Sequence, residues 1–289
     1  MISLERLWPR WSTATLAELP PAMKTWSFGV EYVPIALADD AQLYLTRYGW
    51  PWRRHLMPEQ WCPGGALAGR GVRLARSSGS VFRVGTRVDG RDLQLVVKVS
   101  RVGQRLDEGS LALPSSSTWV PEFHCPFQEF GVVERLRQSP LRPRIHTKRP
   151  LAIFSPGERL RPWQLGRQAG DLARQMARHR ADHALRPDLP HRVELEATRR
   201  YLVVYAWIEG LTLPELHHRG AIDDAELSRI VREARDDLRT HGFCVLDHKP
   251  DHLTLRPRRD ARLPLRHGSL VYALADYELL FELQELVQP

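Results

Sequence analysis

Residues 241–255 read HGFCVLDHKPDHLTL and are the most informative stretch of the chain. Asp247 is followed by Lys249, a proline and a further acid, and Leu253–Leu255 then form an apolar segment typical of a strand. Just before the stretch, residues 223–241 begin with acids, keep their apolar side chains on one helical face and end at a His-Gly pair. The sequence therefore predicts a polar loop that a helix delivers and a strand follows.

The spacing of the charged residues in this loop suits transfer of a phosphoryl group to a hydroxyl. The carboxylate of Asp247 would accept the proton of the attacking hydroxyl, and Lys249 would balance charge on the transferred group. Five residues after the aspartate, such loops carry an asparagine that binds a metal ion, and here His252 takes that place. An imidazole binds metals, although Mg²⁺ prefers oxygen ligands. We interpret Asp247 and Lys249 as catalytic candidates and His252 as a metal or phosphate contact.

Two upstream segments offer groups for the phosphates of a nucleotide. Residues 93–99 read LQLVVKV, an apolar strand in which Lys98 is placed to reach a phosphate. Residues 72–76 and 81–88 predict two further strands joined by a tight turn at Gly79, where backbone N–H groups would approach the anion. The glycine-rich loop of protein kinases has three glycines in such a turn, and this one has a single glycine.

A helix is predicted over residues 126–138, where apolar residues recur near helical spacing and the acids face elsewhere. One of these acids should meet Lys98. Glu129 and Glu134 are both placed to do so.

Two later strands complete the pattern. Residues 200–213 read RYLVVYAWIEGLTL, a buried strand that runs into Glu-Gly and a short helix, and backbone groups from Ala206 to Glu209 would hold the edge of an adenine. Residues 269–275 form an apolar strand that ends at Asp276. An acid at the end of such a strand is where a second metal-binding carboxylate belongs.

Taken in order, these candidates resemble the protein-kinase-like superfamily over roughly residues 72–280, through Gly79, Lys98, Glu129, Glu209, Asp247, Lys249 and Asp276. The Asp-Tyr-Glu at 276–278, close to the end of the sequence, is more similar to small bacterial lipopolysaccharide (sugar) kinases than to Ser/Thr kinases. The resemblance implies an α+β, bilobal fold with a truncated C-lobe and Mg-ATP (or Mn-ATP) between the lobes. It also favours Glu129 over Glu134, because Glu129 is aligned with Leu136, the last core leucine of the helix.

The sequence also departs from that family. No Ala-Pro-Glu follows Asp276, and Val245 replaces the histidine that usually precedes the catalytic aspartate by two residues. Regulated phosphorylation of protein substrates is therefore not expected. The sequence leaves two functions open. One is an ATP-dependent phosphotransferase acting on a hydroxyl acceptor such as a small molecule or sugar, and the other is a pseudokinase that binds a nucleotide or partner without phosphoryl transfer.

The motifs described above divide the sequence into three predicted parts. Residues 1–70 form a Trp- and Pro-rich N-terminal extension, which could bind a protein partner and whose tryptophans we expect in the core. Residues 71–208 form a kinase-like N-lobe with a helical insert at about 155–199, and residues 209–289 form a short C-lobe. Within the insert, two histidines four residues apart lack the glutamate that zinc helices place after the first one.

The composition of the chain limits which partners it can bind and shows that it can fold. The chain has 42 basic and 34 acidic residues, a net charge of +8 and a pI near 9.8, which favours an anionic partner. Basic residues cluster at 135–149 and 256–262 without interleaved aromatic residues, so a solvated arginine-rich surface is preferred to nucleic-acid binding. With 43% hydrophobic residues the chain can bury a core.

Three isolated cysteines indicate a reducing compartment. The longest apolar run, residues 201–208, is far shorter than the ~20 residues of a membrane-spanning helix. We therefore expect a cytoplasmic protein, for which peripheral contact with a membrane stays open.

Overall fold

The computed structural model describes residues 11, 13–65, 67, 71–74, 80–106, 121–139, 145–185, 192–256, 263–266 and 269–286. The chain divides into two compact units. The first consists of residues 1–105, 123–131 and 149–207, and the second of residues 106–122, 132–148 and 208–289. Each unit is described by itself.

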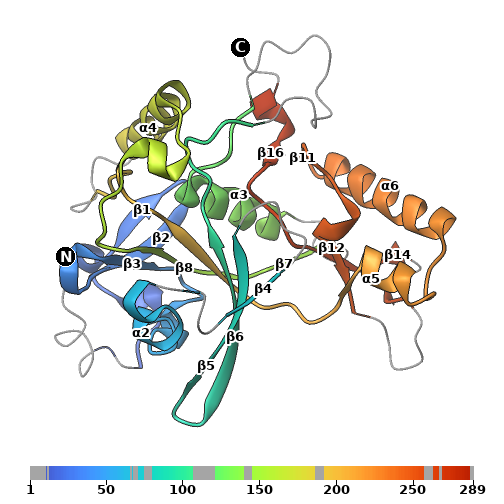
Figure 1. Ribbon diagram of the computed structural model, residues 1–289, viewed down its shortest axis with the longest axis horizontal. Helices are drawn as coiled ribbons and strands as arrows, with labels where there is room; N and C mark the ends of the chain where they lie inside the picture. Colours follow the sequence, from blue (N-terminus) through green and yellow to red (C-terminus); the bar gives the residue numbers. More distant parts are fainter. Residues whose placement is uncertain are drawn as a thin grey trace. The chain divides into compact units, whose positions relative to one another are not determined.

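The first unit is built on a single sheet of eight strands (Figure 1). In spatial order these are β1 (Thr25–Ser27), β2 (Val30–Ala36), β3 (Gln42–Leu45), β8 (Pro150–Ser155), β9 (Leu202–Ala206), β6 (Arg91–Val99), β5 (Val81–Val88) and β4 (Gly71–Arg73). All neighbouring strands pair antiparallel. Residues 25–45, from the predicted N-terminal extension, thus supply three strands at one end of the sheet that carries Lys98.

One face of this sheet is covered by short helices and by apolar residues of the N-terminal segment. Side chains alternate along β6, so that Leu95 and Val97 belong to this core. Trp50 and Trp61 are 1% and 0% exposed there, so the expectation of core tryptophans holds for these two, while Trp11 and Trp52 pack against the core only partly buried. The short helices with residues in this core are η1 (Leu16–Glu18), η2 (Pro21–Met23), η4 (Trp50–Trp52) and α2 (Pro58–Trp61). The same segment also contains η3 (Ala38–Asp40) and η5 (Pro63–Gly65).

The first turns of α3 (Pro126–Gln138) lie against the opposite face of the sheet, and the helix has the predicted bounds. The ring of Phe127 contacts Tyr32 and Tyr44 edge-on, at centroid distances of 5.5 and 5.2 Å. Gly131 makes the close approach possible, because a Cβ at this position would collide with the carbonyl oxygen of Phe28. Aromatic packing and one glycine therefore hold α3 tightly on the sheet.

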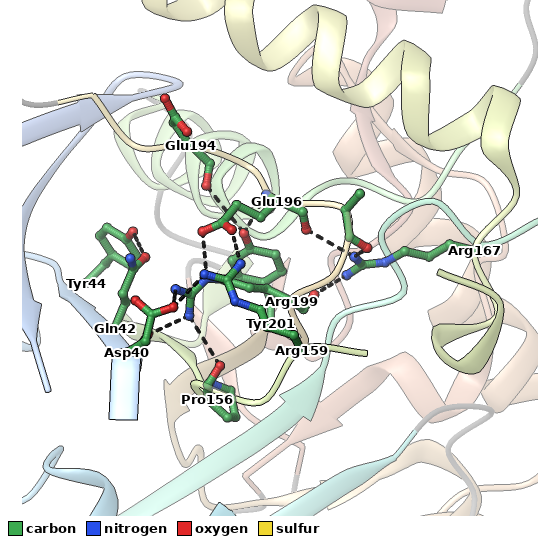
Figure 2. A network of polar contacts seen from close by, with 11 residues as sticks. Asp40, Gln42, Tyr44, Pro156, Arg159, Arg167, Glu194, Glu196, Arg199 and Tyr201 are labelled. Carbon is green, nitrogen blue, oxygen red and sulfur yellow. Dashed lines mark hydrogen bonds and ion pairs between the residues drawn. The ribbon is translucent and has the colours of Figure 1, made fainter. Parts of the chain in front are cut away.

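The predicted insert folds into η7 (Pro162–Leu165) and α4 (Ala169–Ala184) and is held to the sheet by arginines. Figure 2 shows Arg159 and Arg199 converging on Asp40 and Glu196. Arg199 is 1% exposed, and its guanidinium lies 2.7 Å from an Asp40 oxygen and 2.6 Å from a Glu196 oxygen. Arg167 instead donates to carbonyl oxygens, those of Val102, Glu196, Ala197 and Arg199.

The second unit combines helices with small sheets. Its main sheet has the order β10 (Leu211–Thr212), β12 (Leu253–Leu255), β15 (Tyr272–Leu274) and β7 (Ile145–Thr147). Two further pairs join β11 (Phe243–Val245) to β16 (Leu280–Glu282) and β13 (Leu265–Arg266) to β14 (Ser269–Leu270). The helices are α5 (Leu213–His218), α6 (Asp224–Thr240), η8 (Pro250–His252) and η9 (Leu283–Leu286).

Helix α6 is the amphipathic helix predicted before the polar loop, and its start is fixed by a side-chain cap. The carboxylate of Asp223 accepts a 2.7 Å hydrogen bond from the backbone N–H of Glu226. Ile230, Ala234 and Leu238 are buried along one face. The fold class is α+β, as predicted, with a large antiparallel sheet. In the described part of the chain, no helix combines the length and apolar character needed to cross a membrane.

Candidate functional site

The polar loop of the second unit is fixed between two strand pairs. β11 pairs with β16 before it, and β12 pairs with β15 after it. Leu253 lies opposite Leu274 in the second pair, so the end of β15 comes next to the beginning of β12. The backbone N–H of Ala275 donates a 2.8 Å hydrogen bond to the carbonyl of His252. Strand pairing thus brings residues 252 and 276 together although they are far apart in the sequence.

His252 lies between the two predicted acids. Its Nδ1 is 3.9 Å from Oδ1 of Asp247, and its Nε2 is 3.6 Å from Oδ2 of Asp276. The side chains of Asp247, His252 and Asp276 are 13%, 14% and 24% exposed, so all three are partly shielded from water yet reachable. The structure thus brings together three predicted site residues that come from different elements.

Lys249 is oriented toward the same group. Its Nζ lies 3.1 Å from Oδ2 of Asp247, and its side chain is 49% exposed. At this exposure the pair contributes little to stability. An ammonium that can turn between Asp247 and solvent remains available to an incoming phosphate.

The neighbouring His248 does not add a second positive charge. Burial, together with the nearby Arg235 and His252, lowers the pKa of this imidazole to about 4. At neutral pH His248 is therefore uncharged.

The residues present fit one nucleotide-bound Mg²⁺ better than two. Mg²⁺ is commonly held by one or two carboxylates together with substrate phosphates, a role that the partly exposed Asp276 carboxylate suits. At the second position His252 offers nitrogen where Mg²⁺ favours oxygen, and its buried Nδ1 makes no hydrogen bond. Within the described residues, no set of three or more His, Cys, Asp or Glu side chains is arranged to hold a metal ion by itself. The phosphates would therefore supply most of the ligands.

Lys98 and Glu129 lie on the same side of the sheet in the first unit. Lys98 of β6 is 7% exposed and pairs with Val203 of β9. Their neighbours Val97 and Val204 point into the tryptophan core, so Lys98 faces away from it. On the same face, the hydroxyl of Tyr205 donates a 2.7 Å hydrogen bond to Oε1 of Glu129, which is 2% exposed. Tyr205 was not predicted, although its position two residues from Val203 in an apolar strand places it on this face. A direct ion pair of Lys98 with Glu129 stays a prediction.

The alternative acid, Glu134, belongs to the second unit. Its Oε1 lies 3.7 Å from Nε of Arg137, one turn further along α3. Glu129 and Lys98 belong to the same unit, and which acid meets Lys98 stays a prediction.

The strand predicted to hold an adenine is β9, and the N–H groups at its end are engaged within the sheet. Ala206 donates to the carbonyl of Arg149 at 3.0 Å, and Trp207 donates to that of Gln94 at 2.9 Å. Adenine contacts by these two N–H groups would require the sheet to open. Glu209 lies in the second unit, is exposed, and has an oxygen 3.1 Å from a guanidinium nitrogen of Arg256.

Gly79 and its predicted phosphate-binding turn lie outside the described residues. The strands on either side are β4 and β5, and β5 has the predicted bounds. The role of this turn stays a prediction.

Comparison with known proteins adds little to this description. No family model matches the chain, and no curated protein matches it. Among solved structures, it is similar to a chain described as WaaP in complex with acyl carrier protein, with 15% identity and a TM-score of 0.34. The match covers 74% of this chain and 62% of that one, which is less than two thirds of its length. At this TM-score the similarity carries no argument about fold or function.

Proposed function

We propose that this chain is an ATP-dependent phosphotransferase that acts on a hydroxyl of a small-molecule or sugar-like acceptor. The observation that carries the proposal is the convergence of Asp247 and Asp276 on the two ring nitrogens of His252. Asp247 would orient the acceptor hydroxyl and take its proton, and Asp276 would hold Mg²⁺ on the nucleotide phosphates. Such reactions depend mainly on positioning and neutralisation of charge, which two partly shielded carboxylates and the ammonium of Lys249 can supply.

Two residues of the first unit support the nucleotide part of the proposal. Lys98 is a buried amine in a strand, and Glu129 is a buried acid on the same face of the sheet. Burying charged groups is costly, so the presence of both on one face of the sheet favours a functional use. Lys98 would bind a phosphate of ATP, and Glu129 would be the acid that orients its ammonium.

One observation favours a pseudokinase as the second candidate. His252 fills the place where an oxygen ligand for a second metal would be expected, and its Nδ1 is buried without a hydrogen bond. In that case the site would bind a nucleotide or a partner, such as a protein that contacts residues 1–70, and would transfer nothing. Whichever of the two functions holds, we expect the protein to act in the cytoplasm.

The test is ATP turnover by purified protein with Mg²⁺ or Mn²⁺ and a panel of sugars and small alcohols. Asp247→Asn keeps the shape of the side chain and removes the proton acceptor, so turnover should fall by a factor on the order of 10²–10⁴. Asp236→Asn is a matched control, because Asp236 is exposed on α6. Turnover retained by Asp247→Asn would refute the role of Asp247. If the wild-type protein binds Mg-ATP but shows no turnover with any acceptor, the result would favour the pseudokinase function.

A further inference from the structure

The chain has 42 lysines and arginines, and only four are lysines: Lys24, Lys98, Lys148 and Lys249. Arginine is thus the default cation of this protein, even at buried positions such as Arg199. Because a compact ammonium and a planar guanidinium differ in geometry, each lysine is a place to ask whether a single, compact donor is used. Lys98 and Lys249 already belong to the proposed site. Of the other two, Lys148 lies in the same unit as Asp276.

Lys148 lies beside β15, the strand that ends two residues before Asp276. It follows β7, whose last residue, Thr147, pairs in parallel with Leu274 of β15. The Nζ of Lys148 donates a 2.9 Å hydrogen bond to the carbonyl of Ala275, the residue immediately before Asp276. Lys148 is 9% exposed, so this contact is largely removed from water.

The backbone of Lys148 fixes the other side of the same acid. Its N–H donates a 2.6 Å hydrogen bond to the hydroxyl of Tyr277, which in turn donates to the carbonyl of Leu274. Tyr277 is 1% exposed. Contacts of one residue, Lys148, therefore reach both neighbours of Asp276, while the Asp276 carboxylate itself stays partly exposed and faces His252.

We propose that Lys148 is a positioning residue that fixes the backbone on both sides of Asp276 and so aims its carboxylate at a nucleotide-bound divalent cation. This proposal rests on the proposed function. Mg²⁺ demands near-octahedral geometry, so a small rotation of the only carboxylate we assign to it weakens binding. An ammonium on the preceding carbonyl would restrict that rotation, and a planar guanidinium, with its fixed fork of donors, would not reproduce this single contact.

Two measurements on Lys148→Met, Lys148→Arg and Tyr277→Phe test the proposal, with Lys24→Met as control. Lys24 is the matched lysine, because its side chain is 13% exposed but lies in the first unit, near Glu31. The first measurement titrates Mn²⁺ into protein with a fluorescent ATP analogue. The second follows hydrogen exchange of the backbone amides of residues 274–278 by mass spectrometry, without nucleotide or metal.

For Lys148→Met we expect the half-saturating Mn²⁺ concentration to rise roughly 10-fold or more, as for other groups that orient a metal ligand. Affinity for the analogue without metal should stay within about 2-fold of wild type, because Lys148 is assigned no phosphate. Amide exchange at residues 274–278 should accelerate by about 10-fold or more. Lys148→Arg should not restore either value, Tyr277→Phe should shift both in the same direction, and Lys24→Met should shift neither.

Unchanged exchange at residues 274–278 in folded Lys148→Met would overturn the proposal, as would Mn²⁺ affinity within 2-fold of wild type or full rescue by arginine. If the wild type binds no nucleotide under any condition, the proposed function fails. The exchange measurement still decides in that case whether Lys148 fixes the Asp276 segment.

Discussion

Tyr205 of β9 and Glu129 of α3 are joined by a 2.7 Å hydrogen bond in which the phenol donates to the carboxylate. Both side chains are buried, at 2% exposure each, and the Tyr205 ring also packs against Phe130 at a centroid distance of 5.1 Å. The bond fixes the rotation of α3 on the face of the sheet that carries Lys98.

Tyr205→Phe should destabilise the first unit and loosen Glu129. Removing the hydroxyl withdraws a donor from a buried carboxylate, which typically costs about 1–3 kcal/mol. Chemical denaturation should detect this loss, and affinity for Mg-ATP should fall as the carboxylate gains freedom. Tyr48→Phe is the control, because it removes a half-exposed hydroxyl that accepts from Arg47, and it should change stability by less than about 0.5 kcal/mol. Equal effects of the two substitutions would contradict this interpretation.

His252→Asn should distinguish the two proposed functions. Asparagine would place an oxygen ligand between Asp247 and Asp276 in place of the imidazole. If the wild type is a weakly active phosphotransferase, we expect the variant to bind a second Mn²⁺ and to turn ATP over faster. Metal stoichiometry by electron paramagnetic resonance and ADP release provide the two readouts. A variant that binds one metal and turns over no faster would show that His252 is not what limits this site.

The first unit should lose stability in mild acid because of His179 on α4. This imidazole is 3% exposed, and its Nε2–H donates to the carbonyl of Val193 at 2.9 Å. Burial lowers its pKa to about 4, and also lowers that of His183 on the next turn. In the unfolded chain His179 takes up a proton near pH 6.5, whereas in the folded chain it does so only near pH 4. The contribution of neutral His179 to the free energy of unfolding is therefore complete above about pH 7 and is lost as the pH decreases toward 4.

The loss from His179 alone should reach roughly 3 kcal/mol at pH 4, because each pKa unit corresponds to about 1.4 kcal/mol. Urea unfolding between pH 7.5 and 4.0 measures it. His179→Leu should be less stable than wild type at pH 7.5, since it loses the bond to Val193, but should show a shallower dependence on pH. His218→Gln, at an exposed end of α5, should keep the wild-type pH dependence. A His179→Leu curve parallel to wild type would contradict the assignment.

Two helical glycines should respond in opposite directions to alanine. At Gly131 of α3, a Cβ would meet the backbone of Phe28, which cannot move aside as a flexible side chain would, so Gly131→Ala should destabilise by about 1–3 kcal/mol. At Gly170 of α4, a Cβ would meet only a guanidinium nitrogen of Arg174 at 3.6 Å. Gly170→Ala should therefore stabilise by up to about 1 kcal/mol, because alanine favours the helix. Thermal unfolding of both variants checks the difference in sign.

Much of the candidate site could be predicted from sequence because its parts carry local signals. The 3.6-residue spacing gave α3 its bounds, and an apolar run ending at an acid located Asp276. The pairing of β3 with β8 could not be predicted, because Leu43 and Phe154 are more than a hundred residues apart and no local pattern selects one partner among many strands. Lys148 was missed for a different reason. Its only signal is the scarcity of lysine, which becomes informative once the contact with Ala275 is known.

The place of β1–β3 in the large sheet has a consequence for how the protein can be shortened. Every residue of β8 is buried, and β3 pairs along its length from Gln42 to Leu45. A chain starting at residue 71 would turn β8 into a free edge with unpaired backbone groups and bare apolar side chains, the kind of edge that recruits other strands. Such a fragment would be expected to aggregate. The tryptophan-rich segment thus covers an otherwise free edge of the sheet that holds Lys98.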